Sequence, residues 1–505
     1  MEDIAGRGAG QVTTAPATGS DEAVLSRFGY AQELRRKLRF FSVFAVGFSI
    51  ISITTGIFLN YGFGLTYWGP AMIWLWPIAV VGQVLVALVV AELSTRIPLA
   101  GYAYQWSSRL VNPSYGWFVG FAGLMYMTVG GGAIILLVAS PLLISEFGVT
   151  ATPHLTLAVA IIIMILPAVI NIISVQVAAR VNNVAVFTEI IGTVVFAVLL
   201  LILWGVGTKP GLGASIVFNT TSVQHNPLWY SIALASLVGI YTLVGFELAA
   251  DLSEEAINAG HTVPRAVIWA VVGSGVLGMI ALIGFTIAIP DLKAVEAPGL
   301  PLLTIGDYWL GSGLTKVFIA FVVFSMFAII VVGAAAQARL VYSLARDNML
   351  PLSSWFRKVN PRTQTPIIAL VVFGILDIAF MIYGYLQTNA FGTLVAATAI
   401  IPYIIYFLIT VAYARKRAVL EQVPGQFSLG RWAKLVIGLV LGWTVLVILI
   451  LALPAPFHGS DKVIVGGAVL AALWYFLVLR RRLKNGTAGP TSIEQVMAGQ
   501  GKPDA

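Results

Sequence analysis

The chain has no cysteine, and only 10% of its 505 residues are charged. The absence of cysteine excludes disulfides, thiolate metal sites and cysteine nucleophiles. The shortage of charge, together with 59% hydrophobic residues and a mean hydropathy of +0.93, excludes a soluble globular protein. The composition therefore predicts a polytopic membrane protein.

Catalytic motifs are also missing. The sequence has no HExxH and no GxxxxGK[ST] motif, and the glycine-rich GRGAG at residues 6–10 lies in a polar segment that precedes no strand. The four histidines, His154, His225, His261 and His458, lack metal-ligand spacing. We therefore expect no enzyme, no bound cofactor and no metal. The missing phosphate-binding motif also excludes a P-loop nucleotide site.

The amino-terminal segment is polar and rich in small residues. Residues 1–34 contain no apolar run before Arg35, so they do not form a cleaved signal peptide. We interpret residues 1–39 as a cytosolic tail that is disordered in part.

Twelve apolar runs of about 20 residues follow the tail. Their approximate bounds are residues 41–65, 70–93, 113–146, 155–175, 183–206, 228–251, 265–289, 312–343, 366–386, 391–414, 432–453 and 462–480. No gap is long enough for a soluble domain, and the longest, residues 290–309, is expected to form an extracellular cap. The runs predict an all-α protein with twelve transmembrane helices, called spans 1 to 12.

Basic residues indicate the orientation. With the amino terminus inside, 25 of the 29 Lys and Arg lie on cytosolic segments, and the four outside are Lys209, Lys293, Lys316 and Lys462. This bias follows the positive-inside rule and predicts a cytoplasmic-membrane protein with both termini cytosolic. The basic segments before span 1 and after span 12 are expected to contact anionic lipid. The net charge of +8 therefore does not indicate a nucleic-acid partner.

Glycine interrupts two spans at corresponding places. ITTGIF at residues 53–58 lies in span 1, and LVGFEL at residues 243–248 lies in span 6. An odd number of spans per half gives an inverted repeat, and interrupted helices in matching places indicate a binding site near the midplane of the membrane. Close helix packing at small residues is the alternative for either break alone. We place the first repeat at residues 40–210, the second at 211–418, spans 11 and 12 at 419–484 and a cytosolic tail at 485–505.

Four signatures occur in order along the chain. They are ITTGIF, AELSTRIPLAGYAYQW at residues 91–106, GFELAADLSEEAINAGHTVPRA at residues 245–266, and RLVYSLARDNMLP at residues 339–351, which Thr365 and Pro366 follow. Over residues 40–480 the chain resembles the amino acid, polyamine and organocation (APC) superfamily of secondary transporters. It is most similar to the amino acid and choline transporter branch, which includes GABA permeases.

The resemblance implies an inverted five-plus-five fold of the leucine-transporter type with two further helices, in which spans 1 and 6 unwind around the substrate. The matching residues of span 1 are Thr54, Thr55 and Gly56. Those of span 6 are Tyr241, Val244, Gly245 and Phe246. Backbone N–H groups at the half-helix start in span 1 suit a carboxylate. Carbonyls and aromatic rings in span 6 suit an ammonium group, with packing of the bundle as the alternative role of the rings.

Two acidic residues lie within spans. A charge at mid-helix costs about 2.5 to 3.5 kcal/mol on insertion scales, so such residues are functional candidates. Glu189 of span 5 stands where many superfamily members have a lysine that replaces a sodium ion, and we expect it instead to carry a proton. A permanently protonated Glu189 hydrogen-bonded to span 1 or 8 is the alternative. Glu247, after the span 6 break, is expected to act in gating or coupling, or as scaffold.

Other charged and small residues are interpreted as structural. Glu92, Asp251, Glu254, Glu255 and Arg265 are expected to be solvated and ion-paired at cytosolic span ends. Glycine-rich segments in spans 3 and 8, at residues 116–123, 130–132 and 333–338, are expected to pack closely on other helices. Part of span 3 is expected to line the pocket, through residues that the sequence does not identify.

Together these features predict a permease that imports a small amino acid or related amine, such as GABA, by alternating access with proton coupling. Two alternatives remain within transport: an amino acid or amine exchanger, and a carrier of choline-type or polyamine cations. A ligand-binding membrane sensor or channel is the alternative of another class, and the lack of a signalling domain counts against it. The expected partners are the small-molecule substrate, protons and membrane lipids.

Overall fold

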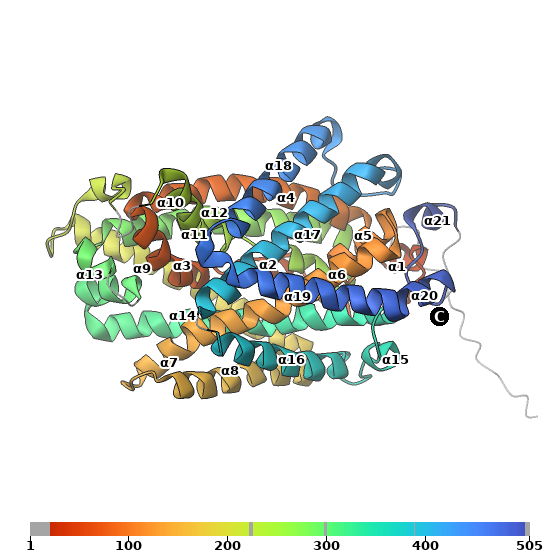
Figure 1. Cartoon of the computed structure of the whole chain (residues 1–505), viewed down its shortest axis with the longest axis horizontal. Helices are drawn as coiled ribbons and strands as arrows, with labels where there is room; N and C mark the ends of the chain where they lie inside the picture. The colour runs from red at the N-terminus through yellow and green to blue at the C-terminus, as the bar shows by residue number, and fades with distance from the viewer. Residues whose placement is uncertain (1–20, 222–225, 297–299, 388, 500–505) are drawn as a thin grey trace, which may run out of the picture.

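The computed structural model describes residues 21–221, 226–296, 300–387 and 389–499. Long helices run roughly along the longest axis of the molecule (Figure 1). In the described residues the β-type pairing is one isolated bridge between Leu38 and Ala256. This arrangement confirms the predicted all-α class.

Eleven helical segments of the described chain are long and apolar enough to cross a membrane. They match every predicted span except span 6, whose first part, Leu228–Ile240, is a shorter apolar helix. The spans are formed, in chain order, by α2 (Phe40–Ile51) with α3 (Ile53–Trp68), α4 (Leu75–Arg96), α6 (Pro113–Ile134) with η2 (Ile135–Ala139) and α7 (Ser140–Glu146), α8 (Pro153–Ile173), α9 (Val175–Gly205), α10 (Leu228–Ala235) with α11 (Leu237–Ile240) and η4 (Phe246–Glu255), α12 (Ala259–Ile287), α14 (Pro301–Arg346), α16 (Ile367–Tyr385), α17 (Ala390–Leu420), α18 (Ala433–Ala452), and α19 (Gly459–Trp474) with η7 (Tyr475–Leu479) and α20 (Arg480–Lys484).

Short helices connect the spans. They are α1 (Asp21–Arg27), η1 (Pro70–Trp74), α5 (Tyr102–Leu110), η3 (Ala214–Phe218), α13 (Leu292–Glu296), α15 (Ser353–Phe356), η5 (Gly430–Trp432), η6 (Ala455–Phe457) and α21 (Ile493–Met497). The segment expected to be a cap, residues 290–309, contains α13 and the start of α14, which bends at Gly311 where φ is 75°. In Figure 1, α1 and α21 lie at one end of the bundle, which we call the terminal end.

Burial separates central from peripheral spans. The apolar window of the first span is 83% buried and that of α17 is 78% buried, against 28% for both α8 and α16. Apolar side chains that stay exposed on the peripheral helices suit contact with lipid tails, which offer no driving force for further burial. Among these windows the most enclosed are the interrupted first span and α17, and residues 233–256 of the sixth span are buried throughout. A site between these three segments would be shielded from lipid.

The described part of the amino-terminal tail is packed against the bundle. Leu25, Phe28 and Leu34 are nearly fully buried, and the N–H groups of residues 37 and 38 donate to Glu255 O at 2.9 and 3.0 Å. The tail therefore hydrogen-bonds to the carboxyl-terminal end of η4. The tail of residues 1–39 was expected to be disordered in part; its residues 1–20 lie outside the described residues, and its residues 21–39 are ordered against the bundle. The repeat boundaries at 210/211 and 418/419 stay predictions.

Candidate functional site

The first span is interrupted at Ser52, between α2 and α3. Ser52 has a φ of 36° and a ψ of 89°, a left-handed conformation that is uncommon outside glycine. Its N–H closes α2 by donating to Phe48 O at 3.0 Å, and its hydroxyl oxygen accepts from Thr55 N–H at 3.4 Å. The break therefore falls at a serine that caps both half-helices. Gly56, expected at the break, lies one turn inside α3.

The N–H groups predicted to bind a carboxylate belong to the first turn of α3, and the protein itself occupies most of them. Thr54 N–H donates to Glu189 Oε1 at 3.2 Å, and Gly56 N–H donates to Ser52 O at 3.0 Å. Thr55 N–H has the long contact of 3.4 Å with the Ser52 hydroxyl. Because hydrogen bonds weaken beyond about 3.2 Å, Thr55 offers the donor that a ligand can most easily recruit.

Glu189 of α9 contacts this break directly. It is 3% exposed, and its Oε1 accepts from the Ser52 hydroxyl at 2.8 Å as well as from Thr54 N–H. Nearby, the hydroxyls of Thr54 and Thr193 lie 2.5 Å apart. Glu189 forms no ion pair within the described residues. A carboxyl group held by neutral donors at the positive end of a half-helix can change its charge without breaking a salt bridge.

The sixth span is interrupted over a longer stretch. Helix α11 ends at Ile240, residues 241–245 form turns and coil, and the chain resumes at Phe246 as the 3-10 helix η4. Gly245 has a φ of 91°, which glycine adopts without strain because it has no Cβ. The second predicted break is thus present at the predicted place.

Two tyrosines of α17 form hydrogen bonds with residues at the second break. The Tyr403 hydroxyl donates to Ile240 O at 2.9 Å. The Tyr406 hydroxyl accepts from Gly245 N–H at 3.3 Å and donates to Glu247 Oε2 at 2.5 Å. Glu247 is fully buried, and its Oε1 has no hydrogen-bond partner in the described part of the chain. Sequence reasoning missed both tyrosines, because aromatic residues in an apolar run do not stand out by composition.

Removal of the Tyr406 hydroxyl tests whether α17 holds the second break. In Tyr406→Phe the buried Glu247 carboxyl loses its partner at 2.5 Å, and hydrogen bonds to charged groups contribute about 1.5 to 3 kcal/mol. We expect a lower melting temperature and a transport rate reduced about tenfold or more. Tyr475→Phe, which removes a 3.1 Å contact with Ser114, is the matched control. Equal rates for the two variants would show that the break does not depend on Tyr406.

The two interruptions pack directly against each other. A Cβ added at Gly56 would lie 2.1 Å from Thr242 Oγ1, and one added at Gly245 would lie 2.3 Å from Ile50 Cγ2 and 2.7 Å from the Tyr126 hydroxyl. No side chain tolerates such distances without displacement of its neighbours. The glycines therefore permit close approach of two helices, as the alternative of close helix packing at small residues predicted. The segments that they bring together are the two breaks.

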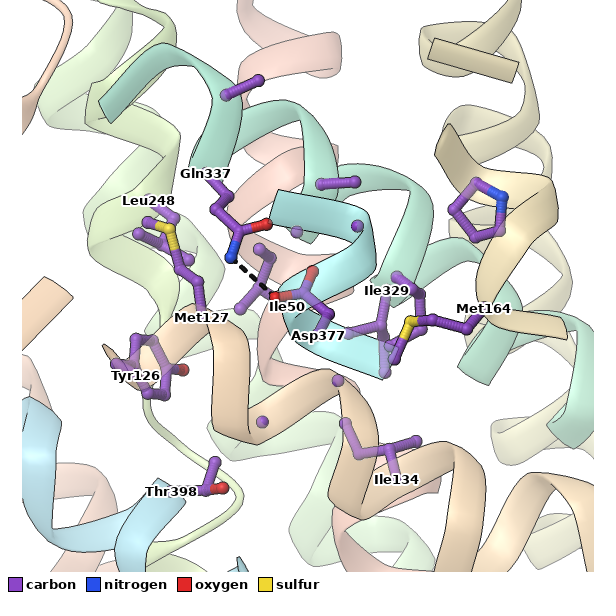
Figure 2. A pocket seen from close by; sticks show the side chains of 18 of the residues that line it. Ile50, Tyr126, Met127, Ile134, Met164, Leu248, Ile329, Gln337, Asp377 and Thr398 are labelled. Carbon is purple, nitrogen blue, oxygen red and sulfur yellow. Dashed lines mark hydrogen bonds between the residues drawn. The ribbon is translucent and has the colours of Figure 1, made fainter. Parts of the chain in front are cut away.

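A cavity opens beside the paired breaks (Figure 2). The space open to the centres of water molecules in it measures about 80 Å³, which is enough for several ordered waters. The predicted binding residues that line it are Thr55, Gly56, Tyr241 and Val244. Those that do not line it are Thr54, Gly245 and Phe246. Thr54 faces α9, and Phe246 packs on Tyr406 with ring centroids 5.8 Å apart.

Helices α6 and α14 supply the cavity walls that the sequence did not identify. Those of α6 are Tyr126, Met127, Gly130, Gly131 and Ile134, and those of α14 include Ile330, Gly333, Ala334 and Gln337. Gly130 was expected to pack closely, and an added Cβ there would indeed lie 3.2 Å from Thr398 Cγ2. The same expectation is wrong for Gly333, where an added Cβ would meet nothing within 4 Å. Gly333 keeps space open in the cavity.

An acidic side chain that sequence reasoning missed also lines the cavity. Asp377 of α16 is 9% exposed, and its Oδ1 accepts from Gln337 Nε2 at 3.0 Å (Figure 2). Gln337 Nε2 also donates to Thr128 Oγ1 at 3.0 Å. The signal was available, since Asp377 is the one acidic residue in the apolar sequence of α16, as Glu189 is in that of α9.

Acidic residues at the terminal end are buried, so their expected solvation is wrong. Glu92, Asp251, Glu254 and Glu255 are 0 to 3% exposed. The expected ion pairing is confirmed for three of them: Glu92–Arg96 at 3.1 Å, Glu254–Arg346 at 2.9 Å and Glu255–Arg339 at 2.6 Å. Asp251 instead accepts from Gly101 N–H at 2.6 Å. The contacts of Asp251, Glu254 and Glu255 fix η4, which continues the sixth span, to its neighbours, whereas the Glu92–Arg96 pair lies within α4.

Metal chemistry finds no support in the described residues. They contain no group of three or more His, Cys, Asp or Glu side chains that could hold a metal ion. The polar groups around the cavity are hydroxyls, amides, backbone groups and single carboxyls. Such groups can form hydrogen bonds with a small polar solute.

Comparison with known proteins identifies the family of this chain. The sequence profile of the family described as Amino acid permease matches residues 38–479. Similar proteins include the amino-acid permease BAT1 of Arabidopsis thaliana, 26% identical over 94% of this chain and 97% of that protein. Others are the GABA-specific permease of Saccharomyces cerevisiae, 24% identical over 95% and 88%, and a putative polyamine transporter of Candida albicans, 24% identical over 96% and 92%. With its interrupted spans and with a profile match over most of its length, the chain belongs to the amino acid permease family of the APC superfamily.

Proposed function

We propose that the protein imports a small amino acid or a related amine by alternating access and couples import to proton movement. Membership of the amino acid permease family supports the substrate class, and relatives named for GABA and polyamines extend it to amines. One observation carries the coupling. The first-span break lies between the cavity, which Thr55 and Gly56 line, and the buried Glu189, which Ser52 and Thr54 contact.

Protonation of Glu189 would change the break in a direct way. A neutral carboxyl group accepts more weakly than a carboxylate from the Ser52 hydroxyl and Thr54 N–H, because charge-assisted hydrogen bonds are the stronger ones. The next residues, Thr55 and Gly56, form the cavity wall and the contact with the second break. A proton at Glu189 thus alters both substrate binding and the packing of the two interrupted spans, which are the elements that alternating access moves.

The substrate itself would bridge the two breaks. Its carboxylate would take the weakly held Thr55 N–H at the positive start of α3. The ammonium group of an α-amino acid, which is adjacent to the carboxylate, would face the second break, where Tyr241 and Val244 line the cavity. Tyr241 offers a ring face to the cation.

Orientation follows from charge. We place the terminal end in the cytosol of a cell whose cytoplasmic membrane holds the protein, since the basic residues concentrate there. Arg480, Arg481 and Lys484 are exposed at this end and would contact anionic lipid headgroups. The buried pairs Glu254–Arg346 and Glu255–Arg339 would act as the inner gate, which has to rearrange when the cytosolic side opens.

Uptake by proteoliposomes tests the proposal. Vesicles with an alkaline interior would be offered radiolabelled amino acids, GABA, putrescine and choline, with and without a protonophore. We expect at least one amino acid or amine to accumulate above its external concentration, and the protonophore to abolish that accumulation.

Other outcomes separate the alternatives. Uptake that requires internal substrate and ignores the pH gradient would identify an exchanger and contradict proton coupling. Accumulation of choline alone would contradict the amino acid assignment. Binding without flux, or currents far faster than carrier turnover, would contradict transport and favour a sensor or channel.

A further inference from the structure

We propose that Asp377 and Gln337 form a second polar subsite, which binds an ammonium group at the far end of the substrate. The inference rests on the proposed function and narrows its substrate class to ω-amino acids and diamines. In such molecules methylene groups separate an ammonium group from the polar group held at the paired breaks.

Two helix faces build the subsite. On α16 the cavity-lining residues Leu370, Gly374 and Asp377 recur at helical spacing. On α14 the residues Ile330, Ala334 and Gln337 recur in the same way. In each series the last residue is polar, and the two polar residues meet through the 3.0 Å hydrogen bond between Gln337 Nε2 and Asp377 Oδ1 (Figure 2). The small residues Gly374 and Ala334 leave room beside them.

An ionised Asp377 has no counter-charge in the described protein. Asp377 is 91% buried, since 9% of its surface is exposed, and it forms no ion pair within the described residues. An unpaired buried carboxylate is unfavourable unless a cation or sufficient hydrogen bonds accompany it. The Gln337 amide and the Thr128 hydroxyl both hydrogen-bond to the carboxyl group, but both are neutral and supply no counter-charge. An ammonium group supplied by the substrate would complete the site.

Asp377 and Glu189 differ in whether a ligand in the cavity can contact them. Asp377 lines the cavity, so a ligand can contact it. Glu189 lies behind the first break, against Ser52 and Thr54, and does not line the cavity. The geometry therefore separates a carboxyl group that recognises the substrate from one that carries the proton.

The cavity between the breaks and Asp377 suits methylene groups. Ile50, Met127 and Ile329 line it together with Asp377, and Figure 2 shows these side chains around the Asp377–Gln337 pair. Apolar walls favour alkyl segments by about 0.8 kcal/mol for each buried CH₂ group. A short substrate such as alanine has no methylene chain with which to reach Asp377.

Matched ligands test the inference on the purified full-length protein. GABA and 2-aminobutyrate are isomers that differ in the position of the ammonium group, and cadaverine and pentylamine differ in the second ammonium group. Dissociation constants from thermal-shift titrations would be compared for the wild type, Asp377→Asn and Asp461→Asn, which changes an exposed aspartate.

In the wild type and in Asp461→Asn we expect GABA to bind more tightly than 2-aminobutyrate, and cadaverine more tightly than pentylamine, by about tenfold or more in each pair. Asp377→Asn should reduce this difference in affinity to within about twofold. The affinities for 2-aminobutyrate and pentylamine should stay unchanged. Absence of a preference in the wild type, or an equal loss for both members of a pair, would overturn the inference. Failure of every amino acid and amine to bind or move would instead reject the proposed function.

A second measurement needs no variant. Carbodiimide labelling of the wild type, read at residue 377 by peptide mass spectrometry, should be slowed by N,N,N′,N′-tetramethylcadaverine and not by N,N-dimethylpentylamine, tertiary amines that an activated carboxyl group cannot acylate to an amide, with the exposed Asp461 as an internal control. Equal labelling of residue 377 in the presence of either amine would contradict a cation subsite there.

Discussion

The Glu189→Gln protein is expected to move substrate across the membrane without concentrating it. Glutamine has the shape of glutamate and can still accept from the Ser52 hydroxyl and Thr54 N–H, so the break should keep its geometry. It cannot gain or release a proton in this role. A gradient of one pH unit corresponds to about 1.4 kcal/mol, or tenfold accumulation for each proton, and the variant should lose all of it.

The measurement is a pair of assays on the same proteoliposomes. Uptake against a concentration gradient, driven by an alkaline interior, should fall to the level of empty vesicles. Exchange of labelled for unlabelled substrate at equal pH should stay within about threefold of the wild type, because binding and the packing of the breaks are retained. Glu22→Gln, which changes an exposed carboxyl group in α1, should behave as the wild type. Normal accumulation by Glu189→Gln would exclude this residue as the proton carrier.

Gly56→Ala is expected to stop transport although it adds one methyl group. The new Cβ would lie 2.1 to 2.5 Å from three side-chain atoms of Thr242, so one of the two breaks has to move. Overpacking of this kind costs about 1 to 3 kcal/mol. Because Gly56 also lines the cavity, the displacement alters the binding site itself, and we expect a ten- to hundredfold loss of transport rate.

Two further variants make this prediction specific. Gly438→Ala adds the same methyl group where nothing lies within 4 Å, and it should transport normally. The double variant Gly56→Ala with Thr242→Gly removes the three clashing atoms and should recover at least part of the activity. Full activity of Gly56→Ala alone would show that the two breaks do not depend on close contact.

The spans and the second break could be predicted from the sequence, and the first break to within a few residues, because bilayer thickness imposes long apolar runs and irregular backbone needs glycine or small polar residues. Sequence reasoning placed the first break at the Thr-Thr-Gly sequence, whereas the chain bends at Ser52. A serine side chain can cap the following half-helix, and this role depends on a conformation that the sequence pattern does not reveal.

Other parts of the site depend on contacts between distant residues. Tyr403 and Tyr406 act on a break more than 150 positions away in the chain, and nothing local distinguishes them from packing aromatics. Glu254 and Glu255 of η4 were expected in solvent because they follow an apolar run, but Arg346 and Arg339 of α14 pair with them and bury them. Asp377 could have been found, since an acid within an apolar run is itself a signal.

The central claim is that the two breaks and the cavity beside them hold the transported molecule. Since the chain has no cysteine, single variants Thr55→Cys and Val244→Cys would each carry one thiol, placed on the cavity wall from either break. The direct measurement is the rate of thiol labelling with and without a transported substrate, with Gly438→Cys on α18 as control. We predict that substrate slows labelling at both cavity positions and leaves the control unchanged; undiminished labelling at both, with transport intact, would contradict the account.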